Sequence, residues 1–300
     1  MMTIKEYAMN GQIKPGLRII DSHAHLGDGE QGALYIKTLP AEESVRLSKR
    51  IGVNAMVASS LKALYGAAPA GNERMMEMTR IFPGYVYASI FYDPHYHDEC
   101  IAQIEKYKDD PGFVGIKIHP RETHTCIATA DYDKLYKYCI DHDMLVACHT
   151  WETEPANNPA DYFHVMERFP ELKLQLCHMG GTYRGCLDSI ELANKYDHVY
   201  LDFNGSLYSQ IWIEELIKQA PIEKFVFGSD QTFNDPRIMV GRVLMADFDD
   251  DIKQKLLAEN FEAIIGRKLV DAKCCILNSI VGIAKDLENI DIKEERLSKQ

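Results

Sequence analysis

Eight short apolar runs recur along the chain, and each is followed by an amphipathic stretch long enough for a helix. Their first residues lie roughly 26 to 36 positions apart, which leaves room for one helix and two loops between runs. Strands that alternate with helices pair in parallel through β-α-β units. The pattern predicts strands over Leu17–His25, Val53–Ser60, Tyr85–Tyr92, Phe113–His119, Met144–His149, Leu172–His178, His198–Asn204 and Lys224–Asp230.

Eight such units in about 250 residues have the count and size of a (β/α)8 TIM barrel. The competing architecture, an open doubly wound sheet, would favour a G-x-G-x-x-G turn after the first strand. The first strand here runs instead into DSHAHLG, and no Ser/Gly or Pro-rich linker divides the 300 residues. We therefore expect an α/β fold with one barrel domain over residues 1–270. Residues 271–300 are expected to form a C-terminal helix and a charged tail.

Composition narrows the class of partner and the compartment. The 33 Lys and Arg residues against 45 Asp and Glu give a formal charge of −12, which would repel a nucleic acid backbone. No run of about 18 apolar residues suits a membrane span, and the N-terminus carries no apolar signal core. The eight cysteines include no C-x-x-C pair, a pattern typical of free thiols in a reducing compartment. We expect a cytoplasmic protein with no nucleic acid or membrane partner.

Imidazole and carboxylate groups stand at the ends of several predicted strands. His23 and His25 close the first run with the alternation that places both side chains on one face. His149, His178 and Asp230 close the fifth, sixth and eighth runs. In a parallel barrel these strand ends meet at one mouth. Three His and one Asp are a suitable ligand set for a divalent, zinc-like ion, and the remaining His can hold the attacking water.

The motifs around these residues resemble one known family in content and order. They are DSHAHLG, GIKIHP, VACHT, LCHMGG and FGSD, closed by AENFEAIIGRKL, and they span residues 17 to about 269. Together they resemble the metal-dependent amidohydrolase superfamily, in its amidohydrolase-related branch. The resemblance implies that His23, His25 and His149 ligate the metal, with Asp230 as a further ligand or as the general base. His178 would orient the attacking water or a substrate oxygen.

Lys117, in GIKIHP, has three interpretations. The resemblance implies an uncarboxylated lysine whose ammonium binds a substrate carboxylate or a polarised oxygen. A carboxylated Lys117 would instead bridge two metals, and a structural ion pair is the third interpretation. We expect one Zn²⁺, with Mn²⁺, Fe²⁺ or Ni²⁺ as alternatives, because His and Asp accept all of these ions.

Further substrate-binding candidates lie in the loops that follow the strands. Arg121 and Arg184 would suit bidentate capture of a carboxylate, although solvated arginines are the simpler interpretation. Trp151 would either wall the pocket or pack its loop. Asn204 and its neighbour Asp202 end the seventh run, where they would contact the substrate or support a ligand.

The function expected first is that of a metal-dependent hydrolase, in which a metal-bound water attacks an amide, ester, lactone or C–N bond of a small molecule. The alternative is a metal-dependent decarboxylase that acts on a small aromatic or unsaturated carboxylic acid, since relatives in the same branch use nearly the same ligands. A third reading is an idle metal-binding scaffold. We expect a small-molecule substrate that carries a carboxylate, and the amphipathic C-terminal stretch could join two copies in a homodimer.

Overall fold

Eight parallel strands form a nearly closed barrel whose neighbours follow the order of the chain, β1 to β8. The computed structural model describes residues 2–27, 39–205 and 208–270. The strands are β1 Ile20–Leu26, β2 Ala55–Ser60, β3 Val86–Phe91, β4 Phe113–Ile118, β5 Leu145–His149, β6 Lys173–Cys177, β7 Val199–Asp202 and β8 Phe225–Val226. The predicted (β/α)8 barrel is confirmed.

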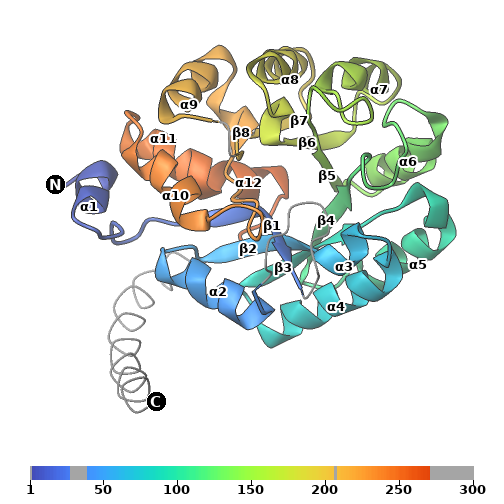
Figure 1. Cartoon of the computed structure of the whole chain (residues 1–300), viewed down its shortest axis with the longest axis horizontal. Coiled ribbons are helices and arrows are strands. Elements are labelled where there is room, and N and C mark those ends of the chain that lie inside the picture. The colour runs from blue at the N-terminus through green and yellow to red at the C-terminus, as the bar shows by residue number, and fades with distance from the viewer. Residues whose placement is uncertain (1, 28–38, 206–207, 271–300) are drawn as a thin grey trace, which may run out of the picture.

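Helices form a ring around the strands, and in Figure 1 the colours run around this ring in chain order. Because each amphipathic stretch buries its apolar side against the sheet, the main core lies between strands and helices. The helices are α1 Ile4–Met9, α2 Ala41–Arg50, α3 Leu61–Leu64, α4 Ala68–Ile81, α5 His97–Tyr107, α6 Asp133–Asp141, α7 Tyr162–Arg168, α8 Tyr183–Lys195, α9 Gln210–Leu216, α10 Pro236–Met245, α11 Asp250–Gln254 and α12 Asn260–Ile264.

The barrel is closed where β1 meets the segment that follows β8. Ser22 N donates to Phe227 O at 2.9 Å, and Asp230 N donates to His23 O at 2.8 Å. Gly228 is required at this seam, since a Cβ there would lie 2.7 Å from the His23 Cβ. The sequence predicted that Asp230 is the last residue of the eighth strand. The regular strand β8 is only two residues long, so Asp230 lies beyond its end.

The opposite end of the barrel forms a floor. A second apolar cluster joins Ile20, Val57, Leu145 and Val226 of the strands to Phe261 of α12. The closing helical segment is divided into α11, a π-helical stretch over Lys255–Glu259 and α12. The predicted C-terminal helix and tail, residues 271–300, lie outside the described residues. No helix in the described ranges is long and apolar enough to cross a bilayer.

Candidate metal centre

His23, His25 and Asp230 converge at the mouth of the barrel. All three side chains are buried, and the potential ligand atoms of the group lie within 4.8 Å of one another. Asp230 Oδ1 lies 3.7 Å from His23 Nε2 and 3.4 Å from His25 Nε2. Two ligand atoms on one tetrahedral ion, each about 2.1 Å from it, are separated by roughly 3.4 Å. The donor types and their spacing therefore fit a divalent metal ion.

Both imidazoles, His23 and His25, lie on strand β1, which has a local irregularity beside them. Its register against β2 shifts by one residue between Asp21 and Ala24, which is the signature of a β-bulge. Bulges occur often beside active sites, where they change the direction of a side chain. Beyond the bulge His25 lies opposite Ser59 of β2, whose Oγ is 2.9 Å from His25 Nδ1. This contact leaves His25 Nε2 facing Asp230.

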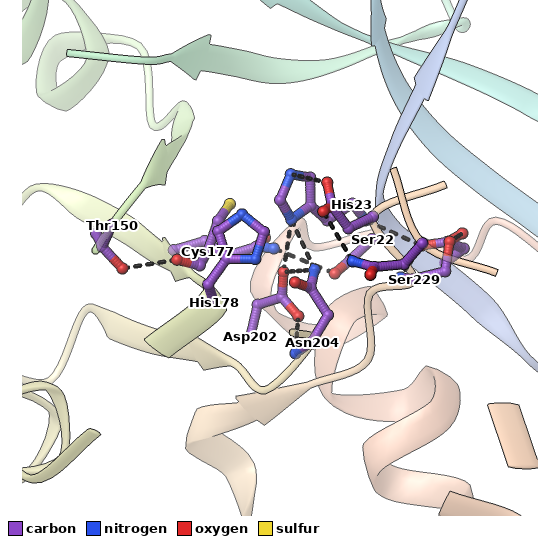
Figure 2. A network of polar contacts seen from close by, with 12 residues as sticks. Ser22, His23, Thr150, Cys177, His178, Asp202, Asn204 and Ser229 are labelled. Atoms are coloured by element: carbon purple, nitrogen blue, oxygen red, sulfur yellow. Dashed lines mark hydrogen bonds and ion pairs between the residues drawn. The ribbon is translucent and has the colours of Figure 1, made fainter. Parts of the chain in front are cut away.

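His23 is oriented by partners on both of its ring nitrogens, as Figure 2 shows. Asp202 Oδ2 lies 2.8 Å from Nδ1, and Lys117 Nζ lies 2.8 Å from Nε2. An ammonium group only donates, so Nε2 accepts from Lys117. Nδ1 then carries the proton that Asp202 accepts, and the amide nitrogen of Asn204, 2.8 Å from Nδ1, donates to Asp202 Oδ2 instead. His23 is therefore held in the tautomer whose Nε2 lone pair faces the cluster. A cation bound at this lone pair requires Lys117 Nζ to turn away.

The ammonium group of Lys117 also lies beside a second group of potential metal ligands, which shares His23 with the first. His23, Cys177 and Asp202 bring donor atoms within 4.8 Å of one another. The ammonium of Lys117 lies 3.3 Å from Cys177 Sγ, and burial raises the pKa of this thiol to about 12. The lysine charge therefore occupies the place that a second cation would take. Asn204, predicted to bind substrate, is also buried here and donates to Asp202 Oδ2 at 2.7 Å.

Asp230 is fixed by its backbone and by one side-chain contact. Its φ of +56° places it in the left-handed region, where a non-glycine residue is uncommon and often functional. Asn234 Nδ2 donates to Asp230 Oδ2 at 2.9 Å. The oxygen Oδ1 is thereby left to face His23 and His25. One carboxylate oxygen is anchored and the other is presented to the cluster.

His149 and His178 lie beside this group but are not members of it. Their ring centroids are 4.7 Å apart, and the His178 ring lies 5.1 Å from that of His23. His178 follows β6 in a short turn with a φ of +64°. His149 ends β5 as predicted, and its ring stacks on His119 at 3.9 Å and on Trp151 at 6.4 Å. Trp151 thus forms part of the wall around His149.

The electrostatic environment favours a cation. Burial lowers the pKa of His23 well below its usual range and that of His178 to about 3, and it lowers the pKa of His25 as well. Burial alone would raise the pKa of Asp230, but His178, His25 and Lys117 outweigh it and the pKa falls. At neutral pH the site therefore offers neutral imidazoles and one carboxylate, the protonation states that metal ligands need.

The two predicted substrate-binding arginines have acidic partners in the structure. Arg184 ion-pairs with Asp188 at 2.7 Å, and its side chain is 71% exposed. Arg121 ion-pairs with Glu154 at 2.6 Å. Glu154 is a residue that the sequence did not single out, and its Oε2 lies 3.5 Å from His149 Nε2. It lies five positions after His149 in a loop without a recognisable motif, so no sequence signal marked it.

A family described as Amidohydrolase matches residues 20–267, which is most of the chain and contains every residue of the cluster. The chain belongs to the amidohydrolase family. No curated protein matches it.

Three similar solved structures illustrate the range of this fold. The 2,6-dihydroxybenzoate decarboxylase from Rhizobium is 12% identical, with a TM-score of 0.67 over 84% of this chain and 98% of that one. A dihydroxybenzoic acid decarboxylase from a Polaromonas species, with bound manganese and an inhibitor, is 14% identical, with a TM-score of 0.64 over 84% and 97%. An Acinetobacter baumannii protein described as a probable 2-pyrone-4,6-dicarboxylic acid hydrolase is 14% identical, with a TM-score of 0.62 over 83% and 99%.

Proposed function

We propose that this amidohydrolase is a metal-dependent hydrolase of small molecules. One observation carries the proposal: Asp230 presents a free carboxylate oxygen to two buried imidazole nitrogens while Asn234 anchors its other oxygen. The metal would be held by His23, His25 and Asp230, with His149 as the fourth ligand. Zn²⁺ is the ion proposed first, because imidazole and carboxylate suit it and the site offers a near-tetrahedral spacing. Manganese in the Polaromonas neighbour supports Mn²⁺ as the alternative.

A divalent ion in such a site lowers the pKa of water and polarises a carbonyl oxygen. The chain would supply the proton transfer. Asp230, ionised at neutral pH, accepts the proton of the attacking water and later returns it to the leaving group. His178, neutral and buried beside it, would orient the water or the substrate oxygen. Lys117, once turned away from His23, would donate to a substrate oxygen or carboxylate.

A decarboxylase is the second candidate, and the structural neighbours favour it. Two of the three solved structures named above are decarboxylases of hydroxylated benzoic acids. Such a reaction needs an acid that protonates carbon. Asp230 presents its free oxygen Oδ1 to two imidazole nitrogens, an arrangement that suits a ligand or a base better than an acid, and for this reason we place the hydrolase first.

A parallel screen separates the two activities. The protein, loaded with Zn²⁺ or Mn²⁺, is offered a panel of esters, lactones and amides, and separately a panel of aromatic and unsaturated carboxylic acids with CO₂ release as the readout. We expect metal-dependent hydrolysis of at least one compound and no CO₂ release. Metal-dependent CO₂ release without hydrolysis would establish the decarboxylase instead. Turnover that is unchanged after removal of the metal would overturn both.

A further inference from the structure

Glu154 is held rigidly at the edge of the mouth by two loops. Its Oε1 accepts from Arg121 Nη1 at 2.6 Å, and its Oε2 accepts from Asn157 Nδ2. Asn157 is fully buried, and its Oδ1 accepts from the backbone N–H of Arg121 at 2.9 Å. A carboxylate fixed by a guanidinium and a buried amide has little freedom to move. Arg121 thus pairs with Glu154 in this structure, and the substrate contact that the sequence suggested for it stays a prediction.

The nitrogen that Glu154 faces has no hydrogen-bond partner. His149 Nε2 is buried, and Glu154 Oε2, 3.5 Å away, is its ion-pair partner at a distance longer than a normal hydrogen bond. A buried nitrogen without a hydrogen-bond partner is destabilising and is therefore uncommon outside functional sites. When Nε2 of His149 carries a proton, a small approach of the two side chains would turn the contact with Glu154 Oε2 into a hydrogen bond.

The plane of the His149 ring is fixed by its neighbours, so the ring has one alternative orientation, reached by half a turn that keeps that plane. The ring stacks on His119 at an interplanar angle of 11° and lies nearly parallel to Trp151 at one of 7°, and these contacts fix the plane of the ring. The ring can therefore turn only by flipping about its Cβ–Cγ bond, which exchanges Nε2 with a carbon. A flipped ring would present a C–H to Glu154 and lose the contact. Glu154 therefore selects one of the two flips.

We propose that Glu154 is a positioning residue of the metal centre. It accepts the proton of His149 Nε2 and so leaves the lone pair of Nδ1 to ligate the metal. The inference rests on the proposed function, because it assigns His149 as a ligand. Metal-ligating histidines commonly donate their second N–H to a carboxylate, and loss of that partner typically costs about 10–100-fold in metal affinity.

The test measures the Zn²⁺ affinity of the metal-free full chain by competition with a chromophoric chelator. We expect Glu154→Ala to bind Zn²⁺ about 10–100-fold more weakly. Glu154→Gln, which keeps the shape and one acceptor oxygen, should lose less and serves as a second variant should Glu154→Ala fail to fold. Glu152→Gln is the matched control. It changes the same residue type in the same loop, where Glu152 accepts from Thr182 at 3.0 Å. Its affinity should equal that of the unmodified protein.

A double-mutant cycle tests whether Glu154 acts through His149. In a His149→Ala background the weaker residual affinity should not fall further when Glu154 is also changed to Ala. An equal fall in both backgrounds, or an unchanged affinity in Glu154→Ala, would overturn the inference while the proposed metal site stood. If the unmodified protein binds no Zn²⁺, the proposed function fails and the inference fails with it. Melting temperatures of the metal-free variants report any structural role separately.

Discussion

Each end of the barrel buries a carboxylate, but the two carboxylates differ in how many hydrogen bonds the protein donates to them. At the floor, Glu262 accepts from Arg18 Nη1, from Lys268 Nζ at 2.9 Å and from the backbone N–H of Leu269 at 2.9 Å. At the mouth, Asp230 Oδ1 has only contacts of 3.4 and 3.7 Å with two imidazoles. Both pKa values lie below their ordinary values. The carboxylate of Glu262 at the floor is satisfied by hydrogen bonds from the protein, whereas Oδ1 of Asp230 at the mouth stays available to a ligand.

The same contrast appears in the buried polar atoms. Within the described ranges, eight buried side-chain nitrogen or oxygen atoms lack a hydrogen-bond partner, and half of them lie at the mouth, on His119, His149, His178 and Asn204. Such atoms are destabilising unless a ligand, a water molecule or a metal ion supplies the missing partner. In barrels of this kind the carboxyl ends of the strands carry the chemistry and the opposite end carries stability.

The largest expected effect belongs to the mouth. Asp230→Asn should lower kcat by about 10²–10⁴-fold, because the amide cannot accept a proton from water. The melting temperature should change little, since the amide keeps the size and the contact with Asn234. The measurement is steady-state kinetics on the best substrate of the screen, with metal content determined in parallel. Activity that survives this change would remove Asp230 from the proton transfer.

The floor should respond in stability instead. Glu262→Gln should cost about 3–5 kcal/mol in the free energy of unfolding, because it leaves the buried Arg18 with only its longer ion pair, 3.4 Å, to Glu259. Denaturant unfolding measures the loss, and Zn²⁺ affinity of the folded fraction should stay the same. Lys268→Met is the control: its side chain is 70% exposed, so its pair with Glu262 should contribute no more than about 1 kcal/mol. A larger loss of metal affinity than of stability in Glu262→Gln would break the comparison.

A smaller effect is expected from the support beneath His23. Asp202→Asn should weaken Zn²⁺ binding by about 10–100-fold, because the amide no longer enforces the tautomer that frees Nε2. Chelator competition measures the affinity. Asp188→Asn, which affects only the partner of Arg184 on α8, should leave it unchanged. Equal affinities in all three proteins would mean that Lys117 and the strand geometry alone orient His23.

The smallest effect is a pH dependence at the floor. Burial alone would raise the pKa of Glu262, but hydrogen bonds from Lys268 and Arg18 hold it below its ordinary value of 4.5. A lowered folded pKa means that the stabilisation is complete above about pH 4.5 and is lost as the pH falls through the folded value. The difference in unfolding free energy between the unmodified protein and Glu262→Gln should therefore shrink below pH 4.5. A difference that grows on acidification would contradict this sign.

The sequence predicted the barrel and its strand order because apolar runs and helical stretches alternate with a regular spacing. The convergence of His23, His25 and Asp230 followed from the rule that parallel strands end at one mouth. The bulge in β1 and the shortness of β8 did not follow, since both depend on how neighbouring strands pair in three dimensions. Glu154 was missed because its role depends on two loops that pack together, which no local pattern records. The roles of His149 and His178 stay predictions.

The central claim is that the mouth binds a divalent metal through His23, His25 and Asp230. The most direct measurement is a calorimetric titration of Zn²⁺ into metal-free protein, with the His23→Ala/His25→Ala double variant titrated beside it. We predict one equivalent of Zn²⁺ per chain for the unmodified protein and no binding at this site in the folded double variant. Absence of binding in the unmodified protein, or equal binding in the two, would contradict the account.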